Sequence, residues 1–152
     1  MELDATDLRI LRALQDDPEG SIEAIGRAAG LSHTPCWRRM KRMQEAGIIK
    51  GRTYVFDEKA VGLSMTVITM IKLLKHDEAS LTDFEREAAR LTEIVECYLV
   101  TGQYDFALTV VTRDIHSFET LLKTRLSNLP HVADMNSTVV LRKVRTGGRL
   151  PI

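Results

Sequence analysis

The stretch LSHTPCWRRMKRMQEAGIIKG, residues 31–51, determines how the first third of this sequence folds. Ser32 is a good helix N-cap, because its hydroxyl can accept a hydrogen bond from an unpaired backbone N–H, and Pro35 is tolerated in a first turn. Three apolar residues recur at i, i+4 and i+7, namely Cys36, Met40 and Met43. Because Gly47 readily adopts the left-handed conformation that ends a helix, the pattern predicts an amphipathic helix between Ser32 and Gly47.

The face opposite this apolar stripe is cationic. Residues 33–52 contain six Lys or Arg and one acid, whereas residues 1–32 contain three Arg and seven acids. A chain with a formal net charge of zero has therefore concentrated its positive charge on one helix and the segment after it, as expected for phosphate contact. The charge alone leaves a solvated surface helix open as the alternative. The candidate DNA-binding residues are Ser32, His33, Thr34, Trp37, Arg38, Arg39, Lys41, Arg42, Lys50 and Arg52.

Several of these candidates have a second interpretation. Arg39 lies nearer the buried edge of the helix, where its head group can instead pair with an acid on the first helix. Trp37 lies either at the rim of the core or against the DNA backbone. His33 and Thr34 stand at the N-terminal end of the helix, where hydrogen-bond donors meet phosphates or base edges, so we expect them to contact DNA.

Two helices are predicted in front of the cationic helix. The first has Asp4 as its N-cap and ends near Asp16, and the second lies between Ser21 and Gly30. The first is expected to bury Leu8, Ile10, Leu11 and Leu14. Two short helices joined by Gly-Leu-Ser, the second cationic on its outer face, are typical of a helix-turn-helix whose second helix enters a DNA major groove.

The segment after the cationic helix is predicted to form a small wing. Residues 48–50 and 52–56 are short extended runs on either side of Gly51, which could pair as a two-stranded ribbon. Lys50 and Arg52 at its tip would reach a flanking phosphate. The first domain is therefore expected to be a winged helix-turn-helix.

A change of hydrophobic period marks a second domain. We place the DNA-binding domain at residues 1–56, a linker at 57–62, and a ligand-sensing and oligomerisation domain at 63–152. In the last of these, strands are expected at residues 64–74, 94–101, 106–112 and 132–144, and helices around residues 81–91 and 115–129. This βαββαβ order predicts an α+β chain whose second domain is a ferredoxin-like antiparallel sheet with two helices on one face.

The uncovered face of this sheet is expected to be buried as well. Its strands alternate little between polar and apolar residues, and no more chain is left to cover them. A second copy would do so, and a two-fold dimer also suits a helix-turn-helix that reads paired half-sites. The second helix of this domain is expected to bury Ile115, Phe118, Leu122 and Leu126.

Neither a membrane segment nor a disulfide framework is indicated. The longest uncharged apolar run, residues 61–71, is far shorter than the roughly 20 residues of a spanning helix. The acidic start of the chain is unlike a signal peptide, so we expect a cytoplasmic protein with no membrane partner. Cys36 and Cys97 lie far apart in sequence, and both are expected to be structural thiols, Cys97 and Met70 lying in the core rather than sensing a ligand.

No catalytic or metal site is expected. His76, His116 and His131 are scattered without ligand-spaced partners, and no Ser-His-Asp, Walker or Gly-rich phosphate pattern is present. Enzymes with ferredoxin-like folds form the competing class, but nothing in this sequence supplies their chemistry. We predict a protein that is not an enzyme and that needs no cofactor.

Four stretches of the sequence resemble the Lrp/AsnC family of bacterial transcription regulators, the leucine- and asparagine-responsive or feast/famine regulators. They are LDATDLRIL at 3–11, IGRAAGLSHTPCWRRMKRMQEAGIIKG at 25–51, ECYLVTGQYDFAL at 96–108 and VVLRKVRTGGRLP at 139–151. The resemblance covers almost the whole chain. It implies a DNA-binding domain followed by a regulatory domain of the RAM or ACT type, and dimers that assemble further into tetramers or octamers.

The resemblance also implies a small effector, commonly an amino acid, bound between dimers near the turn after the second predicted strand. The effector residues that it implies are Thr101, Gly102, Gln103, Tyr104, Asp105, Leu141 and Arg142. A Thr hydroxyl and exposed Gly backbone can meet a carboxylate, and Asp105 can meet an ammonium or hold the turn in shape. Gly102 and Asp105 also fit an ordinary turn, and Gln103 and Tyr104 either select the ligand or are simply exposed. Arg142 and Lys143 stand where some members carry acids, so no particular amino acid is carried over.

Three functional hypotheses follow. The first is a sequence-specific transcription regulator whose DNA binding or assembly responds to a small effector, with double-stranded DNA and further copies of itself as partners. The second is a nucleoid-architectural protein that uses the same surface with weak sequence preference. The third, a small-molecule sensor that does not bind DNA, would leave the cationic helix unexplained.

Overall fold

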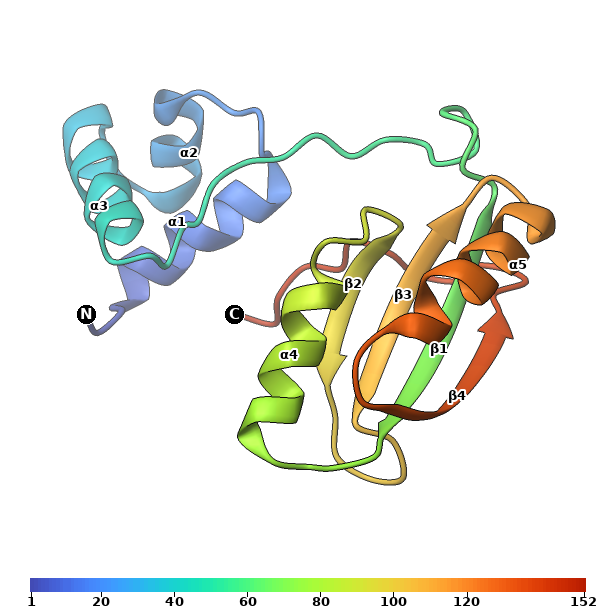
Figure 1. Ribbon diagram of the computed structural model, residues 1–152. Coiled ribbons are helices and arrows are strands. Elements are labelled where there is room, and N and C mark those ends of the chain that lie inside the picture. Colours follow the sequence, from blue (N-terminus) through green and yellow to red (C-terminus); the bar gives the residue numbers. More distant parts are fainter. The chain divides into compact units, whose positions relative to one another are not determined.

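The computed structural model describes residues 1–152, which form two compact units (Figure 1). One unit comprises residues 1–55 and 145–152, and the other comprises residues 56–144. The division expected from sequence placed residues 145–152 in the second domain. In the structure these last eight residues group with the helices and not with the sheet.

The first unit contains three helices, α1 (Ala5–Asp16), α2 (Ile22–Ala29) and α3 (His33–Glu45). Asp4 and Asp7 form a capping box at the start of α1, and the Ser21 hydroxyl caps α2. Gly30 ends α2 in the left-handed conformation, with φ of 73°. The stripe expected on α3 is buried, and with α1 and α2 it builds one core. That core consists of Ile10, Ala13, Ile25, Ala29, Cys36, Met40 and Met43.

Two details of the helices differ from expectation. Ser32 is the N-cap residue of α3, but its side chain makes no capping hydrogen bond. On α1 the most buried apolar residues are Ile10 and Ala13, whereas Leu8, Leu11 and Leu14 are only half-buried. The buried face of α1 therefore consists of Asp7, which is fully buried, together with Ile10 and Ala13.

The expected wing does not form, since residues 48–56 contain no strand. The N–H groups of Ile48 and Ile49 both donate to the carbonyl of Met43, so they close the end of α3 and are not free to pair with a second strand. Both Ile side chains pack against the helical core. Tyr54, the next large side chain, is 85% exposed.

The last residues of the chain pack against α1. The side chain of Gln15 accepts from the N–H of Leu150 at 2.6 Å and donates to its carbonyl at 3.4 Å. Arg12 donates to the carbonyl of Ile152 at 2.7 Å, and Arg149 pairs with Asp16. Residues 12, 15 and 16 share one helical face, so this face of α1 holds an extended segment by its backbone.

The second unit has the expected βαββαβ order and follows a turn at residues 57–63. Its elements are β1 (Met65–Leu73), α4 (Glu78–Ala88), β2 (Ile94–Leu99), β3 (Phe106–Thr112), α5 (Ile115–Thr124), the short 3-10 helix η1 (Leu126–Asn128) and β4 (Val132–Val139). The sheet order is β2-β3-β1-β4, with every pair antiparallel. Both α4 and α5 lie on one face of the sheet (Figure 1). Asp77 and Asp114 cap the two helices.

The core of this unit lies between the helices and the sheet. Phe84 of α4 stacks on Phe106 of β3 with ring centroids 4.4 Å apart, and both rings are fully buried. The face of the sheet away from the helices carries half-buried Ile68 and Met70 and the exposed ring of Tyr98. An apolar surface of this kind is unusual on a monomer unless something covers it.

Three expectations about this unit were wrong. Ile115 opens α5 but points outward and is 62% exposed, because Phe118 and Leu121 form the inward face of the helix. Strand β4 ends at Val139, five residues earlier than expected, and its last bond to β1 is donated by the N–H of Val140 to the carbonyl of Thr66. Cys97 is exposed, since it lies on β2 at the edge of the sheet.

No helix is long and apolar enough to cross a membrane. No group of three or more His, Cys, Asp or Glu side chains is arranged to hold a metal ion.

The attachment of the final segment to α1 can be tested through one amide proton. Gln15→Ala removes the acceptor of the Leu150 N–H, so hydrogen exchange in a peptide containing residues 145–152 should accelerate toward the rate of an unstructured chain. Gln44→Ala on α3 is the matched control, because the Gln44 side chain makes no hydrogen bond and its replacement should change nothing. Equal exchange in the two variants would contradict the attachment.

Candidate nucleic-acid interface and effector site

The outer face of α3 presents polar and cationic side chains to solvent. Thr34, Arg38 and Lys41 are exposed, and the Trp37 side chain is 45% exposed. The Lys41 ammonium lies 5.3 Å from the centroid of the Trp37 ring, a cation–π geometry that supports both side chains on the surface. Trp37 therefore does not belong to the core, and it stands on the face from which a nucleic acid would be contacted.

A buried carboxylate fixes α3 against α1. Asp7 is fully buried, and it accepts from Arg39 at 2.8 Å and from Arg42 at 2.9 Å. Arg39 also donates to Asp4 at 2.6 Å. Hydrogen bonding by the Arg39 guanidinium and by the Asp7 N–H lowers the pKa of Asp4 to about 2. These bonds join the N-terminal end of α1 to the middle of α3 and define where the outer face of α3 points.

This network divides the cations of the interface into two groups. Arg39 and Arg42 have their charge paired with acids on α1, as the second interpretation of Arg39 anticipated. Lys41 is also paired, 3.9 Å from Glu45 on the same helix. The guanidinium of Arg38 makes no ion pair, and neither do Lys50 and Arg52 on the exposed segment after α3. A cation without a protein partner can neutralise a phosphate without first breaking an ion pair. The unpaired cations are therefore the better candidates for contact with DNA.

The N-terminal end of α3 is also open. Ser32, His33 and Thr34 are exposed, and no side chain occupies the N–H groups of the first turn. The imidazole of His33 lies 3.8 Å from the Glu23 carboxylate of α2. Free N–H groups at a helix start attract anions, so this end suits a phosphate or a base edge.

In the second unit, Asp105 closes the turn between β2 and β3. Its carboxylate accepts from the N–H of Leu73 at 2.7 Å and lies 2.9 Å from Nδ1 of His76. Its backbone bonds to Ile71 and to Val100. Both carboxylate oxygens are therefore in use, which favours the interpretation that Asp105 holds the turn in shape. His76 was missed by sequence reasoning, because its partner lies 29 residues away and no local pattern joins them.

The remaining residues of the predicted effector turn are accessible. Thr101, Gly102 and Gln103 are exposed and Tyr104 is half-buried, and Gly102 has a φ of 116°, which favours glycine. The N–H groups of residues 101–104 donate to no backbone acceptor. Such a cluster of free donors suits a carboxylate.

Leu141 and Arg142, the other two predicted effector residues, lie beyond β4. Leu141 is 98% exposed, and neither residue makes a hydrogen bond or ion pair with the turn. The structure of one chain therefore does not bring these two residues together with residues 101–105.

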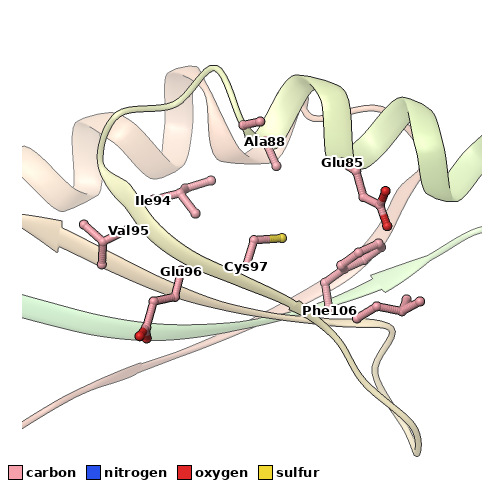
Figure 2. A pocket seen from close by; sticks show the side chains of 9 residues that line it. Glu85, Ala88, Ile94, Val95, Glu96, Cys97 and Phe106 are labelled. Carbon is pink, nitrogen blue, oxygen red and sulfur yellow. The ribbon is translucent and has the colours of Figure 1, made fainter. Parts of the chain in front are cut away.

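The second unit also contains a pocket of about 260 Å³. It lies between α4 and β2, where Ala88 and Glu85 point from the helix toward Ile94 and Cys97 of the strand (Figure 2). Glu96 also borders it but points away from α4 (Figure 2). Sequence reasoning did not find this pocket, because its walls come from separate segments that meet only in the fold.

Comparison with known proteins identifies the family. Residues 3–44 match the AsnC-type helix-turn-helix domain, and residues 66–150 match the Lrp/AsnC ligand binding domain. The chain belongs to the Lrp/AsnC family. The family is made up of DNA-binding transcription regulators, so the expected fold class and family are confirmed.

Relatives of this Lrp/AsnC regulator match it over nearly the whole length. The proline dehydrogenase transcriptional activator of Rhizobium radiobacter is 33% identical over 97% of this chain and 94% of its own. The Bkd operon transcriptional regulator of Pseudomonas aeruginosa is 33% identical over 99% of both chains. An AsnC family regulator from Agrobacterium tumefaciens superposes with a TM-score of 0.90 at 31% identity, covering 98% of this chain and 97% of that one.

A second solved structure was determined with an amino acid. The complex of a Neisseria meningitidis transcriptional regulator with L-Met has a TM-score of 0.90 and 25% identity to this chain, covering 99% of it and 97% of that chain.

The network at the start of α1 predicts a pH dependence of stability. The pKa of Asp4 is lowered from 3.8 to about 2 in the fold, so its contribution is complete above pH 3.8 and disappears as the pH falls through about 2. In Asp4→Asn this dependence should be smaller than in the wild type, because other carboxylates with lowered pKa values remain, whereas Glu2→Gln should retain it in full. Thermal unfolding across this range, followed by fluorescence of Trp37, the one tryptophan, measures the difference.

The structural role of Asp105 predicts that replacing it destabilises the protein even when no ligand is bound. Asp105→Ala leaves the N–H of Leu73 without its acceptor, and we expect it to lower the free energy of unfolding by about 1–3 kcal/mol. His76→Ala removes only an exposed partner and should cost less than about 1 kcal/mol. Urea unfolding of both variants provides the comparison, and an unchanged midpoint in Asp105→Ala would show that the carboxylate does not hold the turn.

Proposed function

We propose that this protein is a sequence-specific transcription regulator whose DNA binding or assembly is modulated by a small effector, an amino acid. The observation that carries the proposal is the exposed cationic face of α3, on which Arg38 is unpaired, within an AsnC-type helix-turn-helix. The match of residues 66–150 to a ligand binding domain supports the effector.

In this proposal α3 lies in the major groove. Arg38, Lys41, His33 and Thr34 contact base edges or nearby phosphates, and Ser32 at the start of the helix contacts a phosphate. Lys50 and Arg52 contact flanking phosphates and fix the register. Trp37, Arg39 and Arg42 lie at the margins of the contact, the last two mainly as links to α1.

The protein acts as a dimer in this proposal, with further assembly into tetramers or octamers. The half-buried apolar face of the sheet around Ile68 and Met70 supports a covering second copy. A two-fold dimer presents two α3 helices to successive major grooves, which suits a palindromic site.

The effector binds at the turn formed by residues 101–105, with Leu141 and Arg142 contributed where dimers meet. The free N–H groups of the turn support a ligand with a carboxylate. The L-Met complex of the Neisseria regulator and the leucine-responsive regulatory proteins among the relatives support an amino acid. An effector changes DNA affinity only if it favours one assembly or arrangement over another.

A nucleoid-architectural protein would use the same surface with little sequence preference. An electrophoretic mobility shift separates the two functions. The purified protein is titrated onto its own promoter region and onto a scrambled duplex of equal length, each with and without a panel of amino acids. Selective binding that one amino acid alters supports the regulator, and equal binding indifferent to the panel supports the architectural protein.

Replacing Arg38 tests the proposed contact with bases. Arg38→Ala should weaken specific binding by about 1–3 kcal/mol and leave binding to the scrambled duplex much less affected, as expected for a bidentate base contact. Lys50→Ala is the comparison, because losing one phosphate contact should weaken binding to both duplexes. It should also reduce the slope of log K against log salt concentration by about 1. Equal losses on both duplexes for Arg38→Ala would assign Arg38 to the backbone.

A further inference from the structure

The helical unit contains a pocket of its own, of about 430 Å³. It lies where the C-terminal halves of α1 and α3 meet the segment that follows α3. Its apolar floor is made by Leu14, Met40 and Ile49, of which Met40 is buried and the other two are half-buried. The volume falls within the roughly 300–1,000 Å³ of small-molecule sites, so the pocket is large enough for a ligand with a single ring.

The rim of this pocket carries polar side chains that have no partner in the protein. Glu19 comes from the loop after α1, Gln44 from the last turn of α3, and Arg52 and Thr53 from the segment after α3. All four are exposed, and none makes a side-chain hydrogen bond or an ion pair. An apolar floor with a few unpaired polar groups around it is the usual composition of a small-molecule site.

The chain that leads to Arg52 is held to the helical core. The N–H of Ile49 donates to the carbonyl of Met43 at 3.2 Å, and the Ile49 side chain packs against the core. Gly51 then has a φ of 150°, a conformation that favours glycine. Arg52 follows directly and lines the pocket, so its guanidinium can bind a carboxylate whose remaining atoms leave water for the apolar floor.

The pocket is complementary to a ligand with two different ends. A guanidinium forms paired, charge-assisted hydrogen bonds with a planar carboxylate. The Glu19 carboxylate belongs to another segment and only accepts hydrogen bonds, so it requires a donor such as a hydroxyl. For the body of the ligand the Met40 thioether favours a flat ring, because methionine sulfur makes favourable contacts with aromatic rings.

We propose that this pocket binds a small aromatic carboxylate that carries a hydroxyl group, with Arg52 donating to the carboxylate and Glu19 accepting from the hydroxyl. The site lies in the helical unit and is separate from the turn of residues 101–105, which belongs to the other unit. Arg52 attracts a phosphate less once a ligand neutralises its charge, so occupancy of the pocket weakens DNA binding. This last consequence, unlike the site itself, rests on the proposed function.

Isothermal titration calorimetry of the full chain with 4-hydroxybenzoate tests the site. The titration extends to about 10 mM, ten times the Kd of a millimolar site. It is repeated with benzoate, which lacks the hydroxyl, and with phenol, which lacks the carboxylate. The wild type should bind 4-hydroxybenzoate most tightly and phenol most weakly.

Variants of the rim assign the two ends of the ligand. Arg52→Gln should weaken binding of 4-hydroxybenzoate roughly 10- to 100-fold, because a hydrogen bond between charged groups is lost. Arg27→Gln is the matched control, since Arg27 is an exposed, unpaired arginine of α2 that does not line the pocket, and it should behave as the wild type. Glu19→Gln should narrow the difference in affinity between 4-hydroxybenzoate and benzoate, because only the first has a donor for Glu19.

Three results would overturn the proposal. They are equal weakening by Arg52→Gln and Arg27→Gln, binding of phenol as tight as that of 4-hydroxybenzoate, and absence of binding to the wild type, whether the site is too weak or a second copy already fills it. The titration contains neither DNA nor an amino acid, so these outcomes do not depend on the proposed function.

The mobility shift with saturating 4-hydroxybenzoate tests the consequence for DNA. Binding to both duplexes should weaken, and the slope of log K against log salt concentration should fall by about 1, as it should in Arg52→Gln without ligand. If the ligand binds through Arg52 and DNA affinity is unchanged, the site stands and the assignment of Arg52 to a phosphate is wrong.

Discussion

The ion pairs around Asp7 are the interaction on which the helical unit depends. A fully buried carboxylate is tolerated only when paired, and removing its partners would leave several kcal/mol of uncompensated desolvation. Arg39 and Arg42 provide the pairing, and both belong to the helix that carries the proposed DNA-contacting face. The orientation of that face is therefore set by electrostatics in the interior as much as by the apolar stripe of α3.

The same constraint recurs in the sheet unit. Asp105 is mostly buried at a turn, and its two oxygens are used by Leu73 and His76. In both units a carboxylate has a structural role that its sequence position did not reveal: Asp7 fixes α3 and Asp105 holds the turn between β2 and β3. Arg38 on α3, in contrast, has no protein partner, so its charge is available for binding.

What the sequence could predict follows from how local each signal is. Caps at Asp4, Ser21 and Asp114 act within four residues, and they were correctly predicted. The βαββαβ order was also predicted, because each element carries its own hydrophobic period. The wing was wrong, because the amides of Ile48 and Ile49 serve α3 instead. Contacts between distant side chains leave no local pattern, and the attachment of the final segment to α1 is of this kind.

The covalent path between the two units limits how an effector can act. The chain passes between the units twice, after residue 55 and after residue 144. The second passage follows closely on Leu141 and Arg142 and ends on the face of α1 that holds Leu150. The opposite end of the same helix carries Asp7, which fixes α3. A ligand can alter DNA binding only if it binds one arrangement of these segments, or one assembly, more tightly than another. A ligand with equal affinity for both would leave their populations unchanged.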